Sequence, residues 1–168
     1  IELCLTALLD PGENVLLPAP GYPLYSAIMA KLDAPLNFYY LDEEKQWQPD
    51  LDDIASRVNS RTRAIVLINP NNPTGAVYDR ETLVGIVEIA RENNLVIFAD
   101  EIYDKLVFEG NTHISIASLT DEVPMVTFGG LSKNFVTPGW RIGWGMVSGP
   151  HTVVREYDEG IKKMLRAR

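Results

Sequence analysis

The sequence predicts an α/β fold, a three-layer sandwich in which helices cover both faces of a mostly parallel sheet. Two strand-sized apolar runs, Ala64–Ile68 and Leu95–Ala99, are continuous rather than alternating, which is typical of parallel strands buried on both faces. Between them, four apolar residues recur at the spacing of one helix face: Leu83, Ile86, Val87 and Ala90. Strand, helix and strand in this order form a βαβ unit, and the rest of the chain alternates similarly.

The first part of the chain predicts helices and strands in alternation. Four apolar residues near the start are spaced as one face of a helix: Ile1, Leu5, Leu8 and Leu9. Two short strands are predicted next, at Asn14–Pro18 and Leu36–Tyr40. Two helices accompany them, one within Tyr22–Lys31 and a shorter one at Pro49–Val58.

The second part continues the pattern. The breaker cluster Asn69–Gly75 ends the Ala64–Ile68 strand, and Asp79 is placed to cap the amphipathic helix that follows. Beyond Leu95–Ala99, two further buried strands are predicted, Met125–Phe128 and Ile142–Val147. A last helix is predicted from five apolar residues: Val154, Tyr157, Ile161, Met164 and Leu165.

Composition excludes several classes of protein. The 168 residues include 15 Lys and Arg against 23 Asp and Glu, and this acidic balance disfavours a nucleic-acid or anionic-membrane partner. The single cysteine, Cys4, excludes an internal disulfide, and the two histidines, His113 and His151, have no metal-ligand spacing. No apolar run approaches the ~20 residues of a membrane span. We expect one domain without metal, in a cytoplasmic protein.

Both ends of the chain lie inside amphipathic helical patterns. Ile1 begins within one such pattern, and Arg168 ends within another. Domains rarely begin and end in the middle of an amphipathic helix, so we expect an internal piece of a longer polypeptide.

Polar clusters follow three predicted strands at the points where the strands end. These clusters are Asn69–Gly75, Asp100–Tyr103 and Gly129–Lys133. Because ligands of open α/β sheets bind outside the carboxyl ends of the strands, we expect four of these side chains to converge: Asn72, Asp100, Tyr103 and Lys133. An amide, a carboxylate, a phenol and an amine at one edge could hold a polar ring and supply a nucleophile.

Each of these residues also has a purely structural interpretation. Asp100 could cap a following helix, and Asn72, which precedes a proline, could simply form a turn. Lys133 could be a solvated surface charge, and Tyr103 could be a core residue with a satisfied hydroxyl. No single residue among these four is enough to indicate a site. A site is favoured because the four residues follow successive strands and are expected at the same edge of the sheet.

Three motifs in this order resemble the class I/II aminotransferases, which are pyridoxal phosphate enzymes of fold type I. The motifs are Asn69–Gly75 (NPNNPTG), Asp100–Tyr103 (DEIY), and Ser132–Lys133 followed by Gly139–Gly143 (GWRIG). The resemblance covers almost the whole chain and is strongest to the alanine and tyrosine aminotransferases. It implies that residues 1–168 are the central part of the cofactor-binding large domain, without its N-terminal phosphate loop and without the C-terminal small domain.

The resemblance also implies a role for each matching residue. Lys133 would bind the cofactor covalently and then move the substrate Cα proton, while Asp100 would pair with the pyridinium nitrogen. Tyr103 and Asn72 would hydrogen-bond the phenolic oxygen of the cofactor.

Two further residues match positions that hold the cofactor. Arg141 would grip the phosphate, and Tyr22 would stack on the pyridine ring, although ordinary core packing is the alternative for Tyr22. Many relatives carry a hydroxyl residue three positions before the lysine. Gly130 stands there in this chain, and Ser132 could substitute for it.

The resemblance implies that the protein transfers an amino group between an L-amino acid and a 2-oxo acid. Alanine or an aromatic amino acid is favoured as the substrate, and the active form is expected to be a homodimer. Two alternatives remain open. One is a carbon–sulfur β-lyase, although the most similar lyases often have His where Tyr103 stands. The other is the ligand-sensing domain of a transcriptional regulator. The chain by itself is expected to be inactive.

Overall fold

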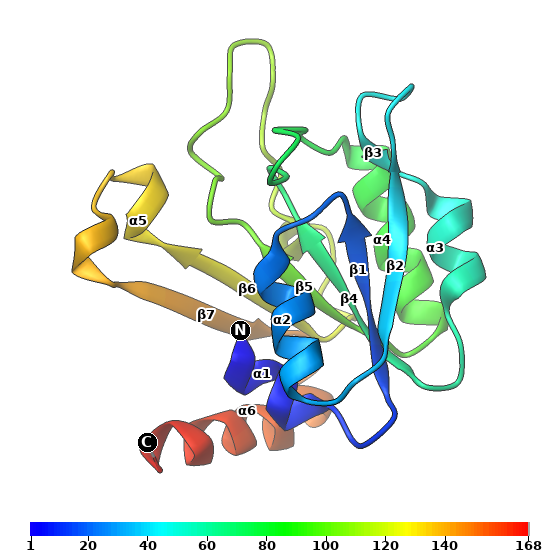
Figure 1. The fold of residues 1–168 in the computed structure, drawn as a ribbon, viewed down its shortest axis with the longest axis vertical. Coiled ribbons are helices and arrows are strands. Elements are labelled where there is room, and N and C mark those ends of the chain that lie inside the picture. The colour runs from blue at the N-terminus through cyan, green and yellow to red at the C-terminus, as the bar shows by residue number, and fades with distance from the viewer. Residues whose placement is uncertain (168) are drawn as a thin grey trace.

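A single seven-stranded sheet organises the chain, as seen in a computed structural model that describes residues 1–167 (Figure 1). The strands are β1 (Asn14–Ala19), β2 (Leu36–Asp42), β3 (Gln48–Pro49), β4 (Thr62–Ile68), β5 (Val96–Asp100), β6 (Met125–Gly130) and β7 (Gly143–Ser148). Their order in space is β3-β2-β1-β4-β5-β6-β7. The five inner strands pair in parallel, and only the two edge strands, β3 and β7, are antiparallel to their neighbours.

Helices cover both faces of the sheet, which confirms the expected three layers. On one face lie α1 (Glu2–Leu8), α2 (Pro23–Lys31) and α6 (His151–Arg166), and on the other lie α3 (Leu51–Arg57) and α4 (Arg80–Glu92) (Figure 1). Three short elements complete the chain: η1 (Ile116–Ser118), α5 (Leu131–Asn134) and η2 (Pro138–Trp140).

The continuous apolar runs fill two separate cores because side chains alternate across each strand. In β4, Ile65 and Leu67 face α4 and pack with its residue Leu83, while Val66 faces the other way and packs in the core that includes Met29 of α2. All five of these apolar side chains are at most 1% exposed. The part of β4 from Ala64 to Ile68 is buried on both faces and therefore has no polar residue, as the sequence pattern indicated.

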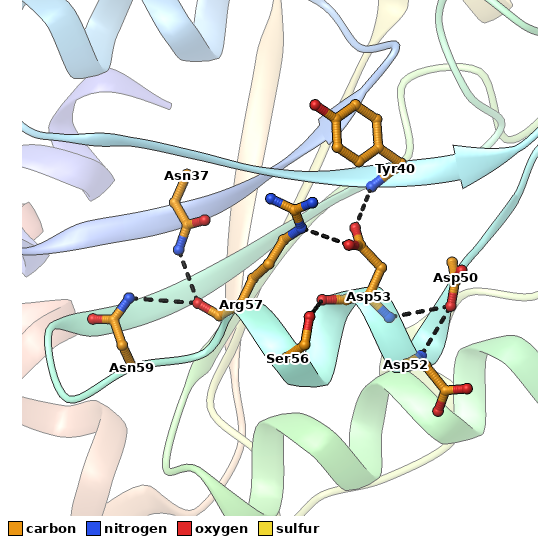
Figure 2. A network of polar contacts seen from close by, with 8 residues as sticks. All are labelled: Asn37, Tyr40, Asp50, Asp52, Asp53, Ser56, Arg57 and Asn59. Carbon is orange, nitrogen blue, oxygen red and sulfur yellow. Dashed lines mark hydrogen bonds and ion pairs between the residues drawn. The ribbon is translucent and has the colours of Figure 1, made fainter.

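Local hydrogen bonds fix α3 against β2 (Figure 2). The Asp50 carboxylate caps the helix by accepting from the backbone N–H groups of Asp52 and Asp53 at 3.0 and 3.1 Å. The Asp53 carboxylate in turn accepts from the Arg57 Nε at 2.7 Å and from the Tyr40 N–H of β2 at 2.8 Å. One carboxylate thus ties the last turn of α3 to the strand beside it.

One predicted strand differs in its surroundings. The sequence predicts a buried strand at Ile142–Val147, but β7 is an edge strand, and Trp144 and Met146 are 53% and 54% exposed. No strand of residues 1–167 pairs with its outer edge. Its apolar residues suited a buried strand because hydropathy alone does not reveal which strands stand at the edge of a sheet.

The buried apolar side chains of the described residues lie in these two cores. Among residues 1–167, no helix is both long enough and apolar enough to span a bilayer.

The cap of α4 gives a direct test of this part of the fold. The Asp79 carboxylate accepts from the Thr82 N–H at 2.7 Å, as its position in the sequence predicted. Asp79→Ala should lower the free energy of unfolding by about 1 kcal/mol, whereas Asp79→Asn, which can still accept this bond, should cost only a few tenths. Urea unfolding of the intact protein measures both. Equal losses in the two variants would show that the cap does not stabilise α4.

Candidate active site

Three loops leave the sheet together at the carboxyl ends of β4, β5 and β6. Asp100 pairs in register with Ile68 on one side and with Phe128 on the other. The pairing continues just past the strands, since the Asn69 N–H donates to the Asp100 carbonyl at 3.0 Å and the Glu101 N–H donates to the Phe128 carbonyl at 3.0 Å. The loops that follow each strand therefore start side by side.

A cavity of about 850 Å³ opens at this edge, within the size range of small-molecule sites. Its walls include every residue that the sequence predicted for the site: Tyr22, Asn72, Asp100, Tyr103, Ser132, Lys133 and Arg141. The seven come from four separate stretches of the sequence, so their convergence is a result of the fold. Their chemical roles remain predictions.

Asp100 is the buried acid of the cavity and is only 7% exposed. Its Oδ2 accepts from the Tyr25 hydroxyl at 2.8 Å, and its Oδ1 accepts from the Ile102 N–H at 3.3 Å. Burial raises the pKa of the carboxyl above its ordinary value, and the Tyr25 hydrogen bond acts in the opposite direction. The alternative in which Asp100 caps a helix is wrong, because residues 102–105 form turns.

Lys133 and Tyr103 face each other across the cavity wall. Lys133 lies in α5, directly after β6, and its Nζ is 5.6 Å from the centroid of the Tyr103 ring, within the range of a cation–π contact. Tyr103 is half-buried rather than a core residue. Lys133 is exposed, as a surface lysine would be, but its amine lies over this ring.

Arg141 and Tyr22 lie at more open parts of the wall. Arg141 follows η2 in a left-handed conformation, with φ at 55°, and its Nη1 donates to the Pro138 carbonyl at 2.8 Å. Tyr22 precedes the first residue of α2 and is 45% exposed, so the alternative of ordinary core packing is wrong.

Glycines allow β7 to approach the end of β6. A Cβ at Gly129 would lie 2.6 Å from the Trp144 Nε1, and one at Gly130 would lie 3.0 Å from the Ile142 carbonyl oxygen. Any side chain at position 130 would therefore crowd the incoming backbone of β7. A larger residue at position 130 would require the neighbouring backbone to shift by a few tenths of an ångström.

Tyr25 is the residue that the sequence analysis missed. It lies in α2, three residues after Tyr22, and is 1% exposed, whereas the sequence predicts only that it belongs to a helix. The sequence does hold one signal for Tyr25: it lies three residues after the candidate Tyr22, and residues three apart share a helix face. Its hydroxyl is directed at Asp100, and no sequence rule relates these two distant positions.

The side chains of the site do not form a metal centre. Within the described part of the chain, no group of three or more His, Cys, Asp and Glu side chains is arranged to hold a metal ion. The predicted site residues instead combine one buried acid, Asp100, with the basic side chains of Lys133 and Arg141 along a partly aromatic wall.

Comparison with known proteins agrees with this arrangement. The family model "Aminotransferase class I and II" matches residues 1–167. The chain belongs to the class I and II aminotransferases. It is 48% identical over 168 residues to glutamate-pyruvate aminotransferase AlaA of Escherichia coli K12 and 44% identical to an alanine aminotransferase of Mycobacterium tuberculosis.

Solved aminotransferase structures have the same fold. The alanine aminotransferase from Pyrococcus furiosus superposes with a TM-score of 0.96 at 44% identity over 99% of this chain. Tyrosine aminotransferase from Leishmania infantum gives 0.93 at 34% identity over 97% of the chain. The chain spans 42% of the Escherichia coli relative and 42% of the Pyrococcus furiosus structure.

The Tyr25–Asp100 hydrogen bond predicts a pH-dependent loss of stability. Tyr25→Phe removes a donor to the carboxylate, which raises the Asp100 pKa further. An acid whose pKa is raised in the folded state destabilises the fold as the pH rises through that pKa. The free energy of unfolding of the variant should therefore fall by about 1 kcal/mol at pH 4 and by about 2–3 kcal/mol at pH 7.

Tyr39→Phe is the matched control for this experiment. The Tyr39 hydroxyl is equally buried but donates to the uncharged Val66 carbonyl at 2.9 Å, so its loss should cost the same at both pH values. Urea unfolding of the cofactor-free intact protein measures all four differences. A Tyr25→Phe loss that does not change with pH would contradict the bond to a carboxylate.

Proposed function

We propose that the intact protein is a pyridoxal phosphate-dependent aminotransferase that moves an amino group between an L-amino acid and a 2-oxo acid. The observation that carries this proposal is the shared cavity of Asp100 and Lys133 in a chain of the aminotransferase family. Relatives named glutamate-pyruvate and alanine aminotransferase favour alanine, and the structural likeness to a tyrosine aminotransferase supports an aromatic amino acid as the second choice.

The proposal includes the larger assembly. Residues 1–168 would be the central part of a cofactor-binding large domain, and the phosphate loop and the small domain would come from other parts of the polypeptide. The chain spans 42% of the length of its relative AlaA, which supports this assignment. We propose a homodimer as the working form.

The donor set of the cavity fits pyridoxal phosphate. This cofactor has a ring nitrogen that can be cationic, an aldehyde and a dianionic phosphate. The cavity offers an acid that is 7% exposed, an amine and a guanidinium, in Asp100, Lys133 and Arg141. Each ionic part of the cofactor thus has a side chain of opposite charge or matching reactivity, and a volume of about 850 Å³ is ample.

Asp100 would keep a proton on the ring nitrogen. Its buried carboxylate is costly to charge alone, and a cation held beside it lowers that cost. Tyr25 donates to one oxygen at 2.8 Å and so orients the carboxylate. When bound, the cofactor supplies an electron-withdrawing ring that accepts the electron pair released at the substrate Cα.

Lys133 would bind the cofactor covalently and move the proton of the substrate Cα. A lysine acts as a base only after it loses its own proton, which desolvation and neighbouring positive charge favour. Tyr103 and Asn72 would donate hydrogen bonds to the phenolic oxygen of the cofactor. The Lys133 Nζ lies over the Tyr103 ring, so the phenol and the amine lie on the same part of the cavity wall.

The remaining wall residues would bind the cofactor without taking part in proton transfer. The Arg141 guanidinium can hold two phosphate oxygens at once, and Ser132 would add a hydroxyl donor beside the lysine. Tyr22 would stack on the pyridine ring.

An assay of the intact protein separates this function from its nearest alternative. With pyridoxal phosphate, L-alanine and 2-oxoglutarate should give pyruvate and glutamate, and L-tyrosine should be tested as the second donor. A β-lyase would instead release pyruvate from cystathionine without any 2-oxo acid. Lyase activity without amino transfer would overturn the proposal.

Covalent labelling tests the assignment of Lys133. After borohydride reduction of the loaded intact protein, peptide mapping should find the pyridoxyl group on Lys133, and Lys133→Ala should lose both the label and turnover. Lys162→Ala is the matched control, because Lys162 also lines the cavity but pairs with Asp158. A label on Lys162 or Lys105 would refute the assignment.

Replacing Asp100 tests the chemistry of the ring rather than the location of the site. Asp100→Asn keeps the size and most hydrogen bonds but removes the charge that keeps the ring nitrogen protonated. The cofactor should still bind, while isotope-monitored proton removal from the substrate Cα should slow by about two orders of magnitude or more.

Glu101→Gln is the control for this change. Glu101 is the adjacent buried acid, 8% exposed, and accepts from the Ile116 N–H at 3.2 Å, outside the cavity wall. Turnover of the Glu101→Gln variant should stay within about threefold of the parent. Near-normal proton removal in Asp100→Asn would reduce Asp100 to a structural residue.

A further inference from the structure

The element that carries Lys133 is too short to fix its own position. The helix α5 has only four residues, Leu131–Asn134, and such a segment has little stability without outside contacts. The two residues that follow it, Phe135 and Val136, are 62% and 82% exposed and provide little packing. Something else must hold the lysine relative to Tyr103.

The Asn134 side chain makes that connection with both ends of its amide. Its Nδ2 donates to the Asp104 Oδ1, and its Oδ1 accepts from the Lys105 N–H at 3.3 Å. Asp104 and Lys105 are the two residues directly after Tyr103. The amide therefore bonds the residue beside Lys133 to the residues beside Tyr103.

The other hydrogen bonds of α5 run elsewhere. Within residues 1–167, the Leu131 N–H donates to the Ile142 carbonyl at 3.1 Å, and the Thr137 hydroxyl donates to the Leu131 carbonyl at 3.0 Å. Both hold the start of α5 to the η2–β7 side. Among the hydrogen bonds of the described residues, only those of Asn134 link the end of α5 to the turn that follows Tyr103.

We infer that Asn134 is a positioning residue that fixes the Lys133 amine over the Tyr103 turn through its paired bonds to Asp104 and Lys105. Its role in turnover rests on the proposed aminotransferase function. An amide is required because it donates to a carboxylate and accepts from an N–H at the same time. A carboxylate at position 134 would repel Asp104, and a methyl group would make neither bond.

Exchanging the two partners provides the test. Asn134→Asp in the loaded intact protein should lower kcat about tenfold to a hundredfold with KM within about threefold, because the reacting amine is misplaced. Asp104→Asn should have little effect, since Asn134 can still donate to an amide oxygen. The double variant Asn134→Asp/Asp104→Asn restores a donor–acceptor pair with reversed polarity and should return kcat to within about threefold of the parent.

Two readouts separate positioning from a loss of folding. The pH titration of the visible absorbance of bound pyridoxal phosphate should shift in Asn134→Asp and return in the double variant. Asn111→Asp, on the exposed loop, adds the same charge and should change neither kcat nor this titration. If Asn134→Asp does not fold, Asn134→Ser, which loses both bonds without adding charge, replaces it.

Hydrogen exchange in the cofactor-free protein tests the connection independently of the reaction. The Lys105 amide should exchange at least tenfold faster in Asn134→Ser, and the amides of α4 should be unchanged. Failure of the proposed function would leave this result intact. Unchanged exchange of the Lys105 amide would overturn the inference. If the parent is active, the inference would also be overturned by an Asn134→Asp variant that keeps its kcat and its titration, or by a double variant that shows no rescue.

Discussion

Parallel pairing of β4, β5 and β6 is the constraint on which the candidate site depends. The register that opposes Asp100 to Ile68 and to Phe128 makes three loops begin at one edge of the sheet. The two cores maintain this register, because a slip by one residue would turn every apolar side chain of β4 to the opposite face. The geometry of the cavity therefore depends on the packing of these cores, one of which also contributes Ile68 and Phe128 to the cavity wall.

The helix α2 connects one of these cores to the site. Its buried face supplies Tyr25, whose hydroxyl bonds the Asp100 carboxylate, and Tyr22 just before its first turn lines the cavity. Burying a carboxylate is unfavourable unless it is hydrogen-bonded, and the donor from α2 meets that need without neutralising the charge. The acid remains available for a cationic partner, and the same helix contributes to the stability of the sheet.

Several parts of the fold and site were predictable because they follow from local periodicity. Apolar runs and helix spacing located the main strands and helices to within a few residues, and Asp79 was identified as a helix cap. The convergence of Asn72, Asp100, Tyr103 and Lys133 followed from one topological rule, that the carboxyl ends of parallel strands share an edge. That rule needs no knowledge of side-chain contacts.

The sequence by itself thus determined the layers, the parallel sheet and the edge at which polar residues gather, since each depends on residues close together in the chain. Tertiary structure alone decided that Tyr25 bonds Asp100, that Asn134 bonds the turn after Tyr103, and that β7 stands exposed at the sheet edge. The two hydrogen bonds join residues 75 and 29 positions apart. Contacts of this kind depend on how whole elements pack, and no local pattern encodes them.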